Sequence, residues 1–337
     1  MTTADLEQVG EELASGGEPQ AKEIAGKSPM RIAMGRLRRD KVAVVSGAIV
    51  LLLIVLGLLA PVICNLWGIY PDNSDPASPR PSEVLDFDTY PLFGPPYHPF
   101  TWAHPLGLAP GTGYDNLARL LYGLRTSLGV AVAATVVSTV VGVTVGLVAG
   151  FARGWLDRVI SFVIDLFLSF PFLLGALSLA PIVTSRFSTD VEALSRAQLI
   201  ALVSVLVVFG WMGLARLIRG QVLSLREREF VQAAQVMGVP TRRILFKELL
   251  PNLVAPIVVA TSLALPAFVA AEAGLSFLGI GLTGTPSLGQ TINRAVDAYE
   301  KYPLYLWTPV VTVMVLVLAL NLLGDSIRDA FDPKTRR

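Results

Sequence analysis

The stretch REREFVQAAQVMGVP, residues 226–240, separates two long apolar segments of the chain. Four apolar residues within it follow the i, i+3, i+4, i+7 spacing of a single helix face, namely Phe230, Ala233, Ala234 and Met237. Gly238 suits the left-handed residue that ends a helix, and Pro240 suits the first turn of the next one. We therefore predict two short helices joined by a sharp turn, in a loop between two membrane spans.

The composition around this loop is that of a membrane protein. Of 337 residues, 53% are hydrophobic and 16% charged, and the mean hydropathy is +0.60, which is too apolar for a soluble domain of this length. The single cysteine, Cys64, forms no internal disulfide, and two histidines do not make a zinc site. Basic residues are spread along the chain without interleaved aromatic residues, which argues against nucleic acid as a partner.

Six apolar segments are long enough to cross a hydrocarbon core of roughly 30 Å. They cover residues 42–64, 127–152, 159–181, 197–215, 253–271 and 304–324. The uncharged stretch 273–293 contains five glycines and Pro286, so it is unsuited to a regular span. We interpret it as a re-entrant or interfacial piece buried against protein, beginning at 275–279. The predicted fold is all-α and polytopic, with six transmembrane helices.

These spans divide the chain into five regions. Residues 1–30 form a mostly disordered tail, 31–64 an anchor with the first span, 65–116 a Pro-rich external segment, 117–325 a core of five spans with a cytoplasmic loop at 220–250, and 326–337 a second tail. In this arrangement 20 of the 27 Lys and Arg residues lie on the side of both termini, which predicts that the termini are cytoplasmic. His98 and His104, six residues apart in the Pro-rich segment, do not make a metal site.

Two features inside the predicted spans concern packing and charge. Gly142, Gly146 and Gly150 repeat every four residues, which allows another helix to approach closely. Asp165 is the one ionisable residue that we place well inside a span. It either hydrogen-bonds a neighbouring helix within the bundle or lines a polar path for translocation.

No motif of a catalytic nucleophile, a metal site or a nucleotide-binding loop is found, so we predict neither an enzyme nor a bound cofactor. A membrane-embedded enzyme is a further alternative, but the sequence shows no set of catalytic residues that would support it. The loop at 226–240 has two interpretations from its residues alone: a surface gripped by a soluble partner, or an amphipathic helix on the lipid headgroups.

The spacing of this loop resembles the EAA loop of ABC importer permeases, the segment that docks into the ATPase subunit. Gln232-Ala233-Ala234, three residues, Gly238 and the later Leu250-Pro251 carry the resemblance. Gln232 stands where the pattern has glutamate, and Glu248 where it has isoleucine. Glu229 is a candidate for the missing ionic role.

Further marks occur in the right order along most of the chain: His104-Pro105-Leu106-Gly107, Arg119-Leu120-Leu121-Tyr122-Gly123, Gly154-Trp155-Leu156-Asp157-Arg158, Gly274-Leu275-Ser276-Phe277-Leu278-Gly279 and Asn321-Leu322-Leu323-Gly324-Asp325. Together they resemble the C-type permease subunit of dipeptide and oligopeptide ABC importers, a family with nickel relatives.

The resemblance implies a type I ABC importer permease fold in the bacterial cytoplasmic membrane, surrounded by lipid. It also implies a second permease, two ATPase subunits that bind ATP and Mg²⁺, an external substrate-binding protein, and peptide import by alternating access. The residues it implies for ATPase coupling are Glu229, Phe230, Gln232, Ala233, Ala234, Met237 and Gly238. Import of nickel or another small solute is the alternative cargo. An ion-coupled secondary transporter is the alternative of a different class, and it should show inverted repeats and paired midplane charges.

Overall fold

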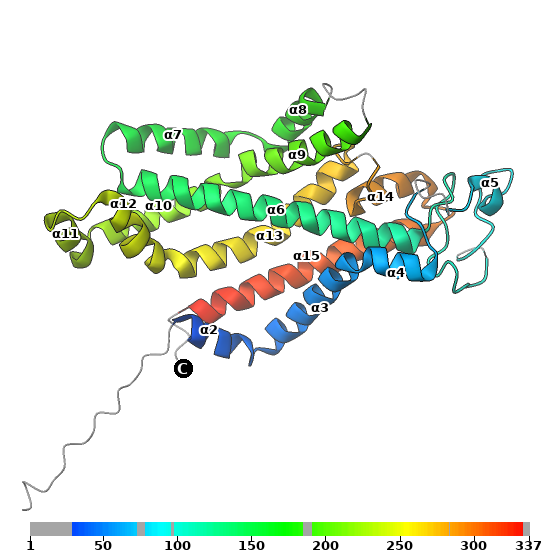
Figure 1. Ribbon diagram of the computed structural model, residues 1–337, viewed down its shortest axis with the longest axis horizontal. Coiled ribbons are helices and arrows are strands. Elements are labelled where there is room, and N and C mark those ends of the chain that lie inside the picture. The colour runs from blue at the N-terminus through cyan, green and yellow to red at the C-terminus, as the bar shows by residue number, and fades with distance from the viewer. Residues whose placement is uncertain (1–28, 73–77, 96–97, 185–190, 283, 333–337) are drawn as a thin grey trace, which may run out of the picture.

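The protein is a bundle of long helices in the computed structural model, which describes residues 29–72, 78–95, 98–184, 191–282 and 284–332 (Figure 1). Within those residues the only β-structure is two isolated bridges, between Leu85 and Pro91 and between Leu108 and Asp115. The tail predicted at 1–30 lies almost entirely outside the described residues. The first helix, α2 (Pro29–Leu37), contacts the last one through Arg36, whose Nη1 donates to the carbonyl of Ala330 at 3.2 Å.

The elements in chain order are α2, α3 (Lys41–Leu58), α4 (Ala60–Trp67), α5 (Pro81–Val84), α6 (Asn116–Phe151), α7 (Trp155–Ser169), α8 (Phe172–Thr184), α9 (Val191–Gly210), α10 (Met212–Arg226), α11 (Glu229–Val236), α12 (Thr241–Arg243), the π-helix η2 (Ile244–Leu249), the 3₁₀-helix η3 (Leu250–Leu253), α13 (Val254–Phe277), α14 (Leu288–Ala295), the 3₁₀-helix η4 (Val296–Ala298) and α15 (Pro303–Phe331). Five continuous helical stretches among the described residues are long and apolar enough to span a membrane: Lys41–Leu58, Asn116–Phe151, Ala193–Arg226, Thr241–Phe277 and Pro303–Phe331.

The third predicted span, 159–181, is not a straight helix. α7 and α8 meet at an angle of 87°, as a broken span or a re-entrant pair. Phe170 is extended between them and is followed by Pro171, which lacks the N–H that helix continuation needs. The ring of Phe170 stacks on Phe209 with centroids 5.9 Å apart, so α9 packs into the bend. The expectation of six regular spans is therefore replaced by five regular spans and one bent pair.

Several predicted boundaries also shift. The first span ends at Leu58, because the chain breaks there before α4, which carries Pro61 in its first turn. α6 begins already at Asn116, capped by Asp115, whose Oδ1 accepts from the N–H of Ala118 at 2.9 Å. α10 continues to Arg226, and α15 continues to Phe331, into the region predicted as a C-terminal tail. Apolarity locates the membrane part of a helix, whereas capping decides where the helix itself ends.

The glycine repeat of α6 allows a close helix contact, so the prediction of tight packing is confirmed. A Cβ at Gly146 would lie 2.7 Å from the carbonyl oxygen of Ala215 on α10. A Cβ at Gly142 or Gly150 would be equally crowded, 2.8 Å from Trp211 O and 2.6 Å from Val222 Cβ. α6 therefore lies in contact with α10 along the half of its length nearest α11.

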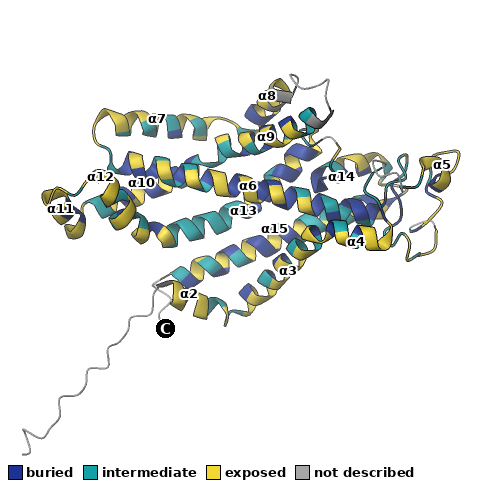
Figure 2. Ribbon diagram, in the orientation of Figure 1, coloured by how far each residue is buried: buried dark blue, intermediate teal, exposed yellow. Residues whose placement is uncertain are grey.

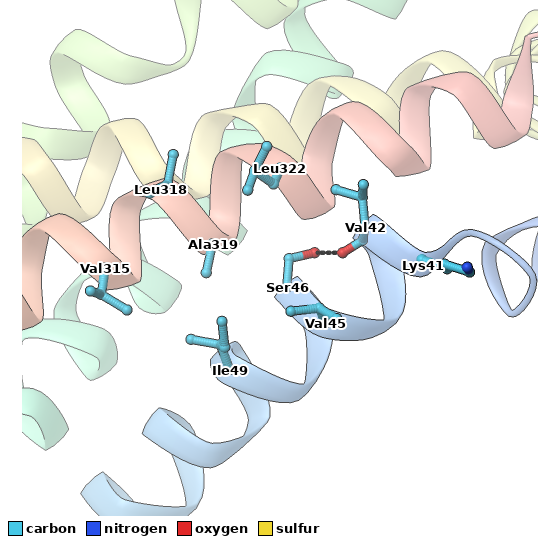
Figure 3. Close-up of a pocket in the computed structure, with 9 residues that line it drawn as sticks. All are labelled: Lys41, Val42, Val45, Ser46, Ile49, Val315, Leu318, Ala319 and Leu322. Atoms are coloured by element: carbon cyan, nitrogen blue, oxygen red, sulfur yellow. Dashed lines mark hydrogen bonds between the residues drawn. The ribbon is translucent and has the colours of Figure 1, made fainter.

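Much of the surface of α3 and α7 is exposed (Figure 2), and many of the exposed side chains on these two helices are large and apolar. Between α3 and α15 lies a groove of about 520 Å³ (Figure 3). Its lining residues are Lys41, Val42, Val45, Ser46, Ile49, Val315, Leu318, Ala319 and Leu322. Ser46 donates to its own helix, at Val42 O and 2.7 Å, so its hydroxyl needs no partner in the groove. Such faces suit a lipid environment.

The stretch predicted as re-entrant is a short helix packed inside the bundle. α13 continues to Phe277, beyond the predicted start at 275, and the chain turns at Gly279 with a φ of +88°. α14 then packs against α6, α13 and α15 with Leu288 and Thr291 buried. The prediction of a buried piece in place of a seventh span is confirmed, with a later boundary.

Candidate functional site

The loop predicted to be functional forms a compact unit at one end of the bundle, where α11 lies farthest from α5 and α14 (Figure 1). Its first attachment is Arg226, the last residue of α10. The Nη1 group of Arg226 donates to the carbonyls of Gly150 and Ala152 at 3.3 and 3.4 Å, which ties the end of α10 to the end of α6. α11 then starts at Glu229 after the extended N-cap Arg228.

The inward face of α11 is held by apolar packing. Val231 is fully buried and Ala234 is 6% exposed, and both lie in one hydrophobic cluster with Val222 of α10 and with Ile244 and Leu249 of η2. The predicted stripe is therefore wrong in one member, because Ala234 faces the protein while the other three face outward. The i, i+3 pair of Val231 and Ala234 makes the buried seam.

The outward face of α11 exposes large apolar side chains. Phe230 is 42% exposed, Met237 74% and Val236 90%, and Ala233 is also exposed. Exposed apolar side chains that cluster on one element mark a surface that another molecule covers. Ala233 has a small side chain at the centre of this surface, so a partner can approach the helix backbone.

The end of α11 is a Schellman motif built on Gly238. The N–H of Val239 donates to Ala234 O and the N–H of Gly238 to Gln235 O, both at 3.0 Å. Gly238 has a φ of +71°, as the sequence predicts. Val239 packs against the same cluster as Ala234, so the turn and the buried seam support each other. Pro240 follows as the residue before α12, one position earlier than predicted.

The polar residues of the loop face solvent. Gln232 Nε2 donates to the carbonyl of Glu227 at 3.3 Å, and both Gln232 and Glu229 are exposed. No salt bridge involves Glu229 in the part of the chain that the structure describes. An exposed carboxylate and an exposed amide three residues apart are thus available to a partner on the same side of α11.

The return path to the membrane is an irregular helix. η2 has π-type hydrogen bonding and η3 is a 3₁₀-helix that contains Pro251. Proline has no N–H to donate, so the helix changes its hydrogen-bond pattern across this point. Leu249 and Leu253 are fully buried, and they join the α11 unit to the start of α13.

The sequence family described as binding-protein-dependent transport system inner membrane component matches residues 142–337. The chain belongs to this family. The N-terminal transmembrane domain of oligopeptide transport permease C matches residues 28–79, so the permease is of the C type.

Curated relatives match nearly the whole permease. The oligopeptide transport system permease protein OppC of Mycobacterium bovis is 36% identical over 90% of this chain and 94% of its own length. The OppC protein of Escherichia coli is 35% identical over 93% and 94%, and the dipeptide transport system permease protein DppC of Alkalihalophilus pseudofirmus is 32% identical over 94% of both chains.

A solved structure shares the fold of the permease. A chain from the inward-facing MetNI methionine ABC transporter aligns with a TM-score of 0.51 and 22% identity, covering 64% of this chain and 96% of that one. The fold is therefore that of an ABC importer permease, and the predicted fold class is confirmed.

Two ion pairs join α7 to α10 in the permease. Asp165 accepts a hydrogen bond from Arg216 Nη2, and both side chains are about 60% exposed. Asp157 forms a bidentate pair with Arg219, at 2.8 and 3.1 Å. Asp165 thus hydrogen-bonds a neighbouring helix, as in the first alternative, but its side chain is exposed and does not face the interior of the bundle. The expectation that it is the one ionisable residue inside a span is wrong, because Glu272 lies within α13 with no exposed surface.

The two histidine side chains have different partners. His104 Nδ1 lies 2.8 Å from Asp115 Oδ2, which joins the Pro-rich segment to the start of α6. His98 lines a pocket of about 380 Å³ together with Lys301 and Tyr302. No group of three His, Cys, Asp or Glu residues suited to a metal ion occurs among the described residues.

Proposed function

We propose that this permease moves di- or oligopeptides across the bacterial cytoplasmic membrane as part of an ATP-driven importer, and that α11 is the surface docked by an ATPase subunit. The relatives named above are dipeptide and oligopeptide permeases, which supports peptide cargo. The complex would contain a second permease, two ATPase subunits that bind ATP and Mg²⁺, and an external substrate-binding protein.

The observation that carries the docking role is the contrast between the two faces of α11. One face, at Val231 and Ala234, is fixed to α10 and η2, while the other exposes Val236 and Met237 beyond the ends of the spanning helices. A partner that covers these side chains gains roughly 25 cal/mol for each Å² of apolar surface removed from water.

The way α11 is attached lets a force on it reach the membrane helices. Its buried seam contacts Val222 of α10, and α10 is packed along the glycine face of α6. The same seam contacts Leu249 and Leu253, which lead into α13. When the ATPase subunits close on ATP, movement of α11 would therefore displace α10 and α13 together and open the bundle to the other side.

The docking role can be tested by cross-linking in the assembled transporter. Met237→Cys in a Cys64→Ala background, treated with a thiol-to-amine cross-linker, should form an adduct with an ATPase subunit. Trp155→Cys, also exposed and at the start of α7, is the matched control and should give little adduct. Adduct formation at position 155 but not at 237 would overturn the assignment of α11.

The transport role is tested separately with vesicles that contain the purified complex and its binding protein. Peptide uptake should require ATP and persist when the proton gradient is collapsed. Uptake driven by a proton gradient without ATP would favour a secondary transporter. Retention of nickel or another small solute by the binding protein, with no peptide uptake, would assign the alternative cargo.

A further inference from the structure

Glu272 is a buried carboxyl group at the junction of three helices, and nothing in the docking role of α11 uses it. It lies in α13 and is fully buried. Its Oε1 accepts from Ser276 Oγ at 2.7 Å, while Oε2 has no hydrogen-bond partner in the described residues. None of the salt bridges among those residues includes Glu272. A buried carboxyl without a cation is costly, so its neighbours must compensate for it.

The other polar neighbours of this carboxyl are Ser127 of α6 and Ser287, the residue that caps α14. Ser127 Oγ accepts from the backbone N–H of Leu288, and Ser287 Oγ accepts from that of Gln290, both at 3.2 Å. Each hydroxyl oxygen therefore accepts one hydrogen bond from the first turn of α14, and the hydroxyl proton remains to be donated. The Glu272 carboxyl lies beside both hydroxyls, and Oε2 is its oxygen without a hydrogen-bond partner in the described residues.

The backbones around this carboxyl are closely packed. A Cβ at Gly289 of α14 would lie 2.1 Å from Ala273 O of α13, and one at Gly123 of α6 would lie 3.1 Å from the carbonyl carbon of Ser287. The first turn of α14 is thus wedged between α6 and α13 directly beside Glu272. The N–H groups of Leu288 and Gln290 in this turn donate to two hydroxyl groups that lie beside the carboxyl of Glu272. A carboxylate is favourable at a helix N-terminus.

We propose that Glu272 is a positioning residue that latches α14 between α6 and α13 through the hydroxyl protons of Ser127 and Ser287, so that the three helices move as one body during transport. α14 lies away from α11, on the side of the bundle toward α5 (Figure 1), where it contacts α6, α13 and α15. Loss of these contacts would let α14 separate from its neighbours. The bundle would then open at that end independently of ATP binding by the ATPase subunits. The inference rests on the proposed function only for its transport consequence.

The test uses a cysteine reporter on α14 in the assembled complex. Ala295 is fully buried, so Ala295→Cys in a Cys64→Ala background should react slowly with a membrane-impermeant maleimide. Ser127→Ala and Ser287→Ala each break one link to α14 and should raise the labelling rate about tenfold, equivalent to ~1.4 kcal/mol. Ser276→Ala is the matched control: this hydroxyl lies on α13 itself, so its loss should leave labelling nearly unchanged.

Substitution of the carboxyl completes the test. Glu272→Leu should label as fast as the two linked serine variants, and Glu272→Gln should be intermediate because its amide keeps one acceptor oxygen. Equal labelling of the Ser276 and Ser127 variants, or slow labelling of Glu272→Leu, would overturn the latch. The reporter does not depend on cargo, so loss of the proposed peptide uptake in the native complex would be recognised as a separate failure.

Discussion

Replacement of Gly238 is the sharpest test of how the docking loop is built. A Cβ at this position would meet nothing within 4 Å, so any penalty is conformational and not steric. The φ of +71° costs an L-residue roughly 1–2 kcal/mol, with a β-branched side chain at the upper end. This penalty corresponds to about a 5- to 30-fold shift in the equilibrium between the closed and open Schellman turn.

Hydrogen exchange measures that shift directly. The N–H groups of Gly238 and Val239 close the turn, and their exchange should accelerate in the order Gly, Asn, Ala, Val at position 238, because asparagine tolerates the left-handed region better than alanine. An isolated helix as short as the eight residues of α11 is marginal, so this turn matters for its stability. Peptide uptake per ATP hydrolysed should fall in the same order.

The matched control is Gly220→Val on α10. Gly220 also has open space around its Cβ, but it lies within a regular helix. Exchange in α11 should be unaffected by this change. Exchange and uptake in Gly238→Val equal to those of the native permease would refute the conformational argument.

Three further predictions follow from the described contacts. Met237→Asp should abolish stimulation of the ATPase while the permease keeps its thermal stability, because the side chain is exposed; a variant that unfolds would contradict this. Gly146→Val should destabilise the permease by about 1–3 kcal/mol through overpacking, measured by thermal denaturation in detergent, whereas Gly129→Val on the open side of the same helix should not. Asp165→Asn should leave stability nearly unchanged because its pair with Arg216 is exposed; a large loss of uptake with intact folding would support the alternative of a polar translocation path.

The sequence allowed the loop at 226–240 to be predicted well because its signals are local. A helical repeat of apolar residues, a glycine after it and a proline two residues later all act within a few residues of one another. Ala234 was assigned to the wrong face because periodicity shows which residues share a side but not which side the rest of the protein covers.

The bend between α7 and α8 and the role of Glu272 were missed for a different reason. Hydropathy averages over a window, so an apolar segment with Pro171 inside still predicts one span. Glu272 fell at the edge of a predicted span that ended at 271, and its burial depends on α14 returning to cover it. A serine in α6 and a serine before α14 become its neighbours only when helices distant in sequence pack together.

By itself the sequence determined that this chain is a helical membrane protein, where most of its spans lie, and which loop contains a glycine turn with exposed apolar residues. These properties follow from hydropathy, charge and backbone preference, which each residue carries with it. Only the tertiary structure decided which face of α11 is buried, that Asp165 pairs with Arg216, and that Glu272 is fully buried and bonded to Ser276. Those outcomes depend on helix packing, because a contact between distant segments has no local signature.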